Sequence, residues 1–405
     1  MSTNQQQPSP KPLAGSGGAG ADHIPEERLA QLVALAGRVV DQAFWAAQFD
    51  LGLAWVHFPP GHGGLGLASS AEQERIAEAL RSAGAPSNAL RNFVGLGTAA
   101  PTIVAHGTAG QQARFLRRIF TCEDIWCQLF SEPGAGSDLA SLATDAARDG
   151  SSWVINGRKV WTTLAHCSRW GLLIARTNAD APKHRGLTCF AVDMTSPGVT
   201  VRPMRQITGE AEFNEVLLED VVVPDSDRIG PVDEGWRVTM STLMHERAHN
   251  GDAAKKPRGT GPIRYAMRLA EVRPPSPALR DRLMRQWVQV EVIRLTALRA
   301  EAERKSGHAG PEGSVLKLAT GISIQQVMRL CMDLAGPQGM LISDYAMRQP
   351  DTMAESTMGD GQADTDTTKA FLNSLSTTIG GGTTEVQRNT IAERILGLPR
   401  DPFPG

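Results

Sequence analysis

The pentapeptide His245-Glu246-Arg247-Ala248-His249 carries two imidazoles and one carboxylate at a spacing that suits metal chemistry. On a helix, residues four apart lie on one face, so the two histidines could hold zinc while the glutamate acts as a general base. Asn250-Gly251 follows directly and is expected to end the helix, and Glu271 is one possible third ligand. We favour two ordinary helix histidines with no bound metal, and keep a zinc peptidase as an alternative.

A glycine-rich run, Gly61-His62-Gly63-Gly64-Leu65-Gly66, matches the pattern of dinucleotide-binding loops. Such a loop follows a strand and opens a helix, because the phosphates bind at the helix N-terminus. Here Pro59 and Pro60 precede it, and no strand pattern does. We therefore interpret this run as an ordinary glycine loop.

The chain length and net charge limit the classes of protein to which this sequence can belong. The 405 residues predict two to three domains, and 41 Lys and Arg against 43 Asp and Glu leave a net charge of -2. Nothing in that balance attracts nucleic acid or an anionic membrane. Five scattered cysteines suit a reducing compartment, and no apolar run is long enough to span a bilayer. We expect a soluble, cytoplasmic protein.

Three regions follow from the hydrophobic periodicity, after a polar, glycine-rich tail over residues 1–23 that we expect to be disordered. Residues 24–125 show helical spacing, including one continuous pattern over 25–49. Residues 126–233 hold short apolar or alternating runs separated by turn signals, which indicate a β domain. Helical spacing returns over 234–400, interrupted at 250–262 and 350–367 by stretches that we interpret as mobile loops. The predicted fold class is α+β.

Two segments of the β region and one near the C-terminus carry a family resemblance. They are Ser131-Glu132-Pro133-Gly134-Ala135-Gly136-Ser137-Asp138, Gly157-Arg158-Lys159-Val160-Trp161-Thr162-Thr163 and Gly380-Gly381-Gly382-Thr383-Thr384-Glu385-Val386-Gln387-Arg388. Together with Phe213-Asn214-Glu215-Val216, Val223-Pro224 and Gly235-Trp236 between them, their order and separation resemble the acyl-CoA dehydrogenase family over about residues 25–400. The resemblance implies that family's fold, with an N-terminal helical domain, a middle β domain and a C-terminal helical bundle.

The resemblance also implies a chemistry. Enzymes of this family form a trans double bond between Cα and Cβ of an acyl-CoA thioester, with a carboxylate removing the α proton and FAD accepting the β hydrogen as hydride. By the same resemblance, Ser137 contacts the bound thioester. The residues implied at the cofactor are Gln128, Phe130, Ser131, Trp161, Thr163, Thr383 and Glu385.

The catalytic base departs from the best-known members of the family. In medium-chain and short-chain enzymes the glutamate directly precedes the Gly-Thr of the C-terminal motif, and Gly381 stands there in this chain. In the isovaleryl and long-chain branches the glutamate lies on a helix after the β domain, just before an arginine. Glu246 and Arg247 match that arrangement, so the resemblance implies Glu246 as base and Arg247 as its partner. Gly381 keeps a backbone N–H that can hold the thioester oxygen.

A second departure concerns the far end of FAD. The Arg-x-x-Phe-Gly segment with which many members bind the pyrophosphate is absent between Tyr265 and Pro277. Either Arg264, Arg268 or Arg273 replaces it, or another subunit supplies those contacts. The turn over 333–339 resembles the other adenine-side element of the family.

The sequence therefore predicts an FAD-dependent acyl-CoA dehydrogenase that passes electrons to an electron-transfer flavoprotein. We expect a homodimer or homotetramer, or a mixed tetramer with a paralogous subunit. A flavin-dependent monooxygenase or oxidase on the same fold and a non-catalytic subunit stay open as alternatives. The helix position of the base points to branched or bulky acyl groups, including steroid side chains.

Overall fold

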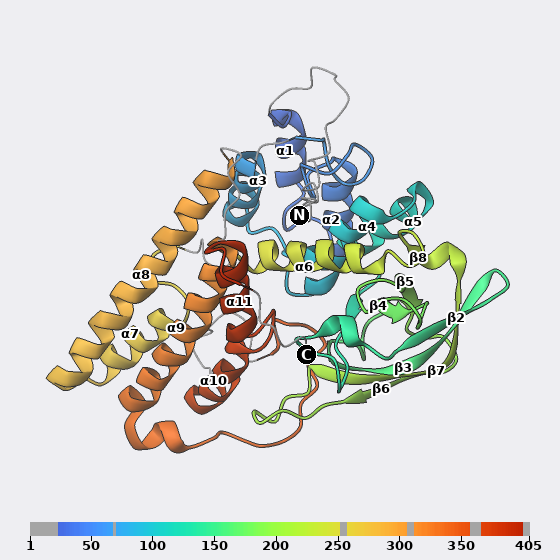
Figure 1. The fold of residues 1–405 in the computed structure, drawn as a ribbon. Helices are drawn as coiled ribbons and strands as arrows, with labels where there is room; N and C mark the ends of the chain where they lie inside the picture. Colours follow the sequence, from blue (N-terminus) through green and yellow to red (C-terminus); the bar gives the residue numbers. More distant parts are fainter. Residues whose placement is uncertain (1–22, 68–69, 252–256, 306–311, 357–365, 400–405) are drawn as a thin grey trace. The chain divides into compact units, whose positions relative to one another are not determined.

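The computed structural model describes residues 23–399 except 68–69, 252–256, 306–311 and 357–365. All but His23 of the predicted tail lies outside the described residues. The chain divides into two compact units, one ending at Pro86 and one beginning at Ser87. Figure 1 shows the elements of each unit.

The first unit is helical. It contains α1 (Glu26–Val33), α2 (Asp41–Asp50) and α3 (Ser70–Ser82), and buries Leu32, Phe44 and Ile76 completely. The helical spacing over 25–49 corresponds to two helices, because the chain turns after Val33 and Gly37 takes a φ of +68°. A left-handed residue cannot continue a right-handed helix.

The glycine run over 61–66 forms turns inside this unit. Gly61, Gly63 and Gly66 all have positive φ, and the run follows a proline pair and no strand. A Cβ on Gly64 would lie 2.3 Å from the carbonyl oxygen of Trp55, so the chain crosses itself here at a distance that only glycine allows. The glycines of this run therefore have a structural role, which is to let the chain cross itself closely.

The second unit is built on one mixed sheet of eight strands. Their order is β6-β7-β3-β2-β4-β5-β8, with β1 parallel to β4 off this path. The strands are β1 (Trp126–Leu129), β2 (Asp145–Asp149), β3 (Ser152–Thr163), β4 (Trp170–Arg176), β5 (Leu187–Asp193), β6 (Val199–Pro203), β7 (Phe213–Pro224) and β8 (Arg228–Ile229). The α+β fold class is thereby confirmed.

Alternating side chains of these strands form the core of the sheet. Ile155, Phe190 and Val216 are completely buried in it, and Leu129 joins them from β1. The twelve residues Phe213–Pro224 form one long strand, β7, which pairs antiparallel with β3. That pairing shifts register between Lys159 and Thr162, so a bulge falls on the segment that carries Trp161.

Helices of the second unit precede and follow the sheet. Before it come a π-helical turn, η1 (Gly95–Ala99), then α4 (Ala100–His106) and α5 (Ala109–Phe120). After it come α6 (Gly235–Gly251), α7 (Pro262–Val272), α8 (Pro277–Lys305), α9 (Glu312–Ala335), α10 (Thr367–Ser374) and α11 (Thr384–Arg394). A second core forms among α7, α8, α9 and α10, where Ala266, Leu330 and Cys331 are completely buried.

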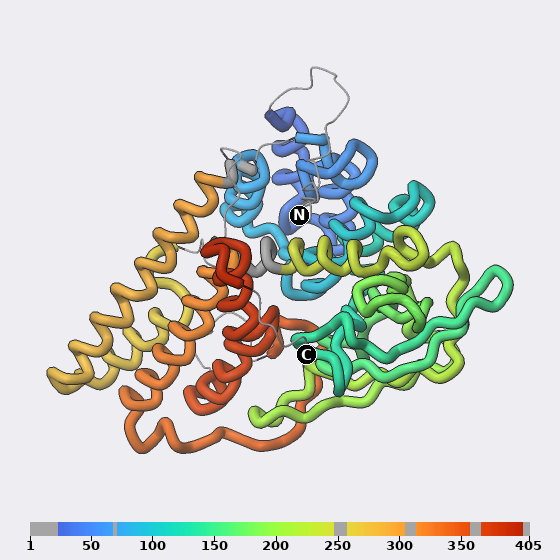
Figure 2. The backbone as a smooth tube through the Cα atoms, viewed as in Figure 1, coloured from blue at the N-terminus to red at the C-terminus, as the bar shows by residue number. Residues whose placement is uncertain are grey.

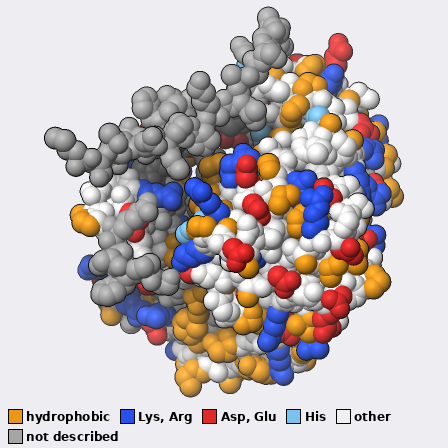
Figure 3. All heavy atoms as spheres, turned by 45° about the vertical axis from the view of Figure 1, so that its right-hand side comes forward, with side chains coloured by type: hydrophobic (Ala, Val, Ile, Leu, Met, Phe, Trp, Pro, Cys, Tyr) orange, Lys and Arg blue, Asp and Glu red, His pale blue; other side chains and the backbone are white. Residues whose placement is uncertain are grey.

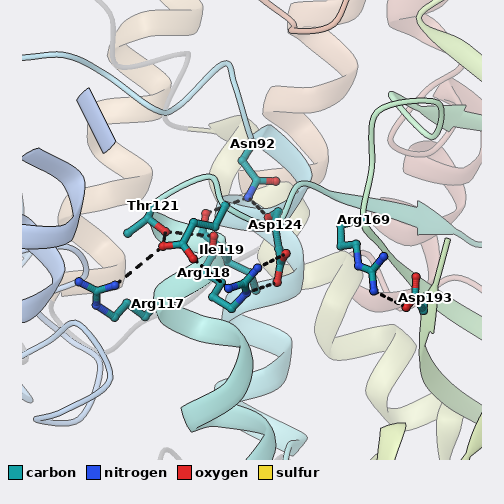
Figure 4. Close-up of polar contacts among 9 residues, drawn as sticks. Asn92, Arg117, Arg118, Ile119, Thr121, Asp124, Arg169 and Asp193 are labelled. Carbon is teal, nitrogen blue, oxygen red and sulfur yellow. Dashed lines mark hydrogen bonds and ion pairs between the residues drawn. The ribbon is translucent and has the colours of Figure 1, made fainter. Parts of the chain in front are cut away.

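Asn92 fixes the start of β1. Its amide nitrogen donates to the carbonyl oxygens of Ile119 at 2.8 Å and Asp124 at 3.0 Å, and its amide oxygen accepts from the N–H of Trp126 at 3.1 Å. Arg118 pairs with the carboxylate of Asp124 beside it (Figure 4). One buried side chain thus ties the end of α5 to the start of β1.

The chain between α9 and α10 follows the sheet before it reaches α10 (Figure 2). Arg348 forms a bridge with Glu210, and its N–H donates to the carbonyl oxygen of Gly209 at 3.1 Å. His166 contacts the carbonyl oxygen of Pro350 at 3.0 Å. Residues 350–356 of the predicted mobile loop therefore pack in place, and its remainder over 357–365 lies outside the described residues.

Candidate active site

Glu246 and Gly381 meet in space, although they are far apart in the sequence. Glu246 lies on α6, and Gly381 lies in the turn between η6 (Leu375–Thr378) and α11. A Cβ built on Gly381 would lie 3.6 Å from Oε1 of Glu246. The two positions from which the family resemblance expects a base therefore converge on one point.

Gly381 has a φ of +66° and Gly382 a φ of +91°, which are backbone conformations that residues other than glycine rarely adopt. Immediately after them Thr383 caps α11 by accepting from the N–H of Val386 at 3.2 Å. The amide of the buried Gln387 points back to the carbonyl oxygen of Gly381 at 3.5 Å. The turn is thus held from its C-terminal side, with the Gly381 backbone exposed.

Two further polar side chains surround the Glu246 carboxylate. From β1, Nε2 of Gln128 lies 3.5 Å from Oε2 of Glu246, at the long end of the hydrogen-bond range. From α9, Cε of Lys317 lies 3.4 Å from the point where a Cβ of Gly381 would stand. Burial lowers the pKa of Lys317, and the charge of Glu246 acts in the opposite direction.

Trp161 presents an aromatic face to solvent from the bulge in β3. Its side chain is 58% exposed, its φ is +58°, and its ring meets Phe213 edge to face with centroids 5.8 Å apart. A left-handed tryptophan in a strand costs backbone energy and is seldom left exposed without a function. Thr163 lies half-buried two residues later.

A fully buried ion pair supports the segment after β1. Nζ of Lys159, which is 0% exposed, donates to Oε1 of Glu132 at 2.8 Å and to the carbonyl oxygen of Phe130 at 3.1 Å. The Glu132 carboxylate also accepts from the N–H groups of Ala143 at 2.7 Å and Thr144 at 3.0 Å. These bonds fix both ends of the turn that carries Ser137.

The charge state of this pair follows from its contacts. Burial opposes ionisation of Glu132, but the Lys159 ammonium and the hydrogen bonds outweigh it and lower the pKa of the carboxyl group. Burial lowers the pKa of Lys159 to about 8, with Glu132 acting against it. Both groups are therefore charged at neutral pH.

The segment Phe130–Ser137 offers its backbone beside this pair. Phe130 is buried, Ser131 is half-buried and its carbonyl oxygen accepts from the N–H of Val160 at 2.9 Å, and Ser137 is exposed. Among the described strands β1 pairs with β4 alone, and Asn92 accepts from the N–H of Trp126 at its start. An exposed aromatic face, a strand edge and a half-buried carboxylate are groups that fit a flavin and a thioester.

Other predicted residues lie at the margin of this arrangement. Glu385 is exposed on α11 and bonds to Thr384 and Arg388. The side chains of Arg247 and His249 lie outside the described residues, and His245 contacts Ser241 at 3.3 Å. Within the described part of the chain no three His, Cys, Asp or Glu side chains gather as metal ligands would.

One of the three predicted adenine-side arginines, Arg273, meets the turn over 333–339 at the C-terminal ends of α7 and α9. Arg273 lines two cavities, of about 210 and 520 Å³, together with residues of the turn over 333–339. One of its guanidinium nitrogens lies 2.7 Å from where a Cβ of Gly336 would stand, so glycine is required for this approach. Arg264 is exposed on α7 and Arg268 lies near the Tyr265 ring. Arg273 is the arginine that the structure brings to the turn.

Sequence reasoning missed Lys317, Glu132 and Lys159 as site-forming residues. Glu132 and Lys159 lie inside the motifs already quoted, and an acid and a base flanking buried apolar residues could have suggested a pair. Nothing in the sequence around Lys317 marks it, because a lysine on a long helix is usually solvated.

Comparisons with known proteins agree with this geometry. Residues 21–123, 127–221 and 233–396 match the acyl-CoA dehydrogenase N-terminal, middle and C-terminal domains. Acyl-CoA dehydrogenase IpdE1 of Mycobacterium tuberculosis is 39% identical over 393 residues, covering 96% of this chain and 93% of that protein.

Two solved structures have a similar fold. The ChsE4-ChsE5 complex of Mycobacterium tuberculosis contains a chain with a TM-score of 0.69 and 28% identity, covering 93% of this chain and 98% of that one. The Tcur3481-Tcur3483 steroid ACAD gives a TM-score of 0.72 at 24% identity, covering 94% of this chain and all of that one. No helix in the described ranges is long and apolar enough to cross a membrane.

Proposed function

Because the chain belongs to the acyl-CoA dehydrogenase family, we propose that it oxidises a branched or bulky acyl-CoA to the trans-2-enoyl-CoA with Glu246 as base. Family membership implies a flavin, and we take this flavin to be FAD and its electron acceptor to be an electron-transfer flavoprotein. The observation that carries the proposal is the Glu246 carboxylate beside Gly381, at the point where the family needs a base.

Different residues remove the proton and stabilise the negative charge that develops. Glu246 takes the α proton at a carboxylate oxygen, and the N–H of the exposed residue Gly381 would donate to the thioester oxygen on which negative charge develops. Bound FAD supplies hydride acceptance from Cβ. Trp161, Thr163 and the backbone of Gln128, Phe130 and Ser131 would hold the isoalloxazine, Thr383 and Glu385 would lie toward the cofactor, and Ser137 would contact the thioester.

Glycine at 381 also bears on the substrate class. A side chain there would begin between Glu246 and Lys317, in ordinary van der Waals contact with both. Because Glu246 on α6 supplies the base, the space beside Gly381 stays available to the substrate. This favours acyl groups with a branch or ring near Cα, among which steroid side chains are one candidate.

We also propose that the active assembly contains a second subunit. One face of α8 leaves apolar side chains exposed at helical spacing, at Met284, Val288, Val292 and Leu295. The chain similar to this one in the ChsE4-ChsE5 complex comes from an assembly of two different proteins. Without the Arg-x-x-Phe-Gly segment, Arg273 or a paralogous partner would bind the pyrophosphate of FAD.

An anaerobic panel of acyl-CoA thioesters tests the function. Purified protein loaded with FAD is mixed with straight, α-methyl-branched and steroid-derived thioesters, and bleaching of the flavin absorbance is followed. We expect bleaching with branched or steroid-derived thioesters and formation of the 2-enoyl product. Oxygen-dependent turnover without anaerobic bleaching would instead indicate a monooxygenase or oxidase. Bleaching only after a paralogue is added would indicate a non-catalytic subunit.

A further inference from the structure

Lys317 lies at the junction of the groups that the proposed reaction uses. It extends from α9 past Gly381, where its Cε and the Oε1 of Glu246 both lie within 3.6 Å of the point at which a Cβ would stand. The side chain is half-buried. A half-buried cation beside a half-buried carboxylate interacts with it more strongly than a surface pair would.

The ammonium group of Lys317 has a second, structural contact. Nζ donates to the carbonyl oxygen of Thr377 at 2.6 Å. Thr377 belongs to the short helix that ends just before Gly380-Gly381-Gly382, and its hydroxyl also donates to the carbonyl oxygen of Gly321 on α9 at 3.1 Å. Lys317 therefore holds the glycine turn against α9 while placing its charge toward α6.

We propose that Lys317 is a positioning residue for proton abstraction, which keeps the Glu246 carboxylate ionised and fixes the turn that presents the Gly381 N–H. This rests on the proposed function, because it assigns Lys317 to the same site. Taking a half-buried carboxylate out of water favours its neutral form, and a neutral acid cannot remove a proton. The nearby cation reverses that preference.

Other titratable groups on the elements packed against α6 and α9 have described contacts of their own. On α6, His245 contacts Ser241, and Glu246 is the last residue whose side chain the structure describes. Gln128 on β1, which contacts Glu246, is neutral. Among the other groups with described contacts are His106 on α4 near Arg237, Arg176 on β4 with the carbonyl of Ala140, Asp193 on β5 with Arg169, Asp333 on α9 with Arg282 of α8, Lys369 on α10 with Asp344, and Glu385 with Arg388 on α11.

The test compares Lys317→Met, Lys317→Arg and the matched control Lys369→Met in the full chain loaded with FAD. Lys369 is also a buried lysine, but it pairs with Asp344 at 3.4 Å. The rate of anaerobic flavin bleaching is measured against pH. We expect Lys317→Met to move the acid-side midpoint up by about one pH unit, hence roughly tenfold slower bleaching below it. Lys317→Arg and Lys369→Met should keep the wild-type midpoint.

A second measurement does not depend on turnover. The urea midpoint of unfolding at pH 7 is compared for wild type, Glu246→Gln, Lys317→Met and the double variant. We expect Lys317→Met to lower the midpoint more when Glu246 is present, because only then does it remove a cation that acts on a nearby carboxylate. Equal lowering in both backgrounds, with an unchanged pH midpoint, would show a purely structural lysine and overturn the proposal. If no thioester bleaches the flavin, the proposed function fails, and the urea comparison alone still decides whether the two charges are coupled.

Discussion

Two lysine–glutamate pairs lie within the second unit, and they differ in how much freedom the carboxylate keeps. In the pair beside the segment after β1, Lys159 and Glu132 are buried and joined at 2.8 Å. Near the glycine turn, Lys317 instead bonds to a backbone carbonyl and acts on the half-buried Glu246 through space. The Glu132 carboxylate is saturated, because it accepts from three donors, whereas the Glu246 carboxylate is half-buried beside Gly381. A saturated buried pair suits a scaffold, and a half-buried carboxylate beside the glycine turn suits a base.

The largest expected effect comes from removing the half-buried carboxylate of Glu246. We expect Glu246→Gln to lower the rate of flavin bleaching by about 10²-fold or more, because an amide cannot accept the α proton. Flavin content and thermal unfolding should match wild type. The control is Glu234→Gln, which changes an exposed carboxylate just before α6 that pairs with Arg237. Wild-type activity in Glu246→Gln would refute the base assignment.

Breaking the saturated pair should act on stability instead. We expect Lys159→Met to lower the free energy of unfolding by about 3–5 kcal/mol, because it leaves Glu132 charged and buried without its cation. Urea unfolding measures this loss, and flavin retention should fall with it. Lys183→Met, which breaks an exposed pair with Asp138, should cost at most about 1 kcal/mol. Similar losses in the two variants would contradict the distinction.

A third carboxyl group, that of Glu212, extends the comparison. It is buried, and its described side-chain partners are neutral. It is 0% exposed and contacts Gln206 and Ser356. Burial, and next the charge of Glu210, raise its pKa above the ordinary 4.5. The folded chain thus holds this proton more tightly than the unfolded chain, so stability is lost as pH rises from about 4.5 through the raised value.

We expect Glu212→Gln to raise the free energy of unfolding by about 1 kcal/mol at pH 7.5 and to change it little at pH 4. Glu132 has the opposite sign, because its lowered pKa contributes stability that is lost as pH falls through the folded value. Unfolding measured across this pH range in Glu212→Gln and Glu132→Gln separates the two. A parallel pH dependence of both variants would show that burial of Glu212 does not favour its neutral form.

The sequence predicted the strongly periodic elements and the residues inside contiguous motifs. The helical spacing predicted over 234–400 corresponds to the helices α6 to α11, and the short runs predicted over 126–233 correspond to the strands of the sheet. β2 (Asp145–Asp149) was missed because only Ala146 of its five residues is buried, so it carries little alternation. Lys317 could not be predicted, because its meeting with Glu246 depends on how α9 packs beside α6. The roles of Trp161, Ser137 and Glu246 stay predictions that rest on the family's motifs.

The left-handed backbone at Trp161 sets the stability of the folded chain against the proposed role of the tryptophan ring. Glycine would relax this position, by roughly 1 kcal/mol or more, so the empty protein would gain stability by losing its tryptophan. The exposed ring contributes little to the core beyond its contact with Phe213, and under the proposed function its main benefit arises when the flavin stacks on it. Stabilisation of this chain by directed evolution without added cofactor would therefore tend to erode position 161, whereas the same selection in excess flavin would preserve it.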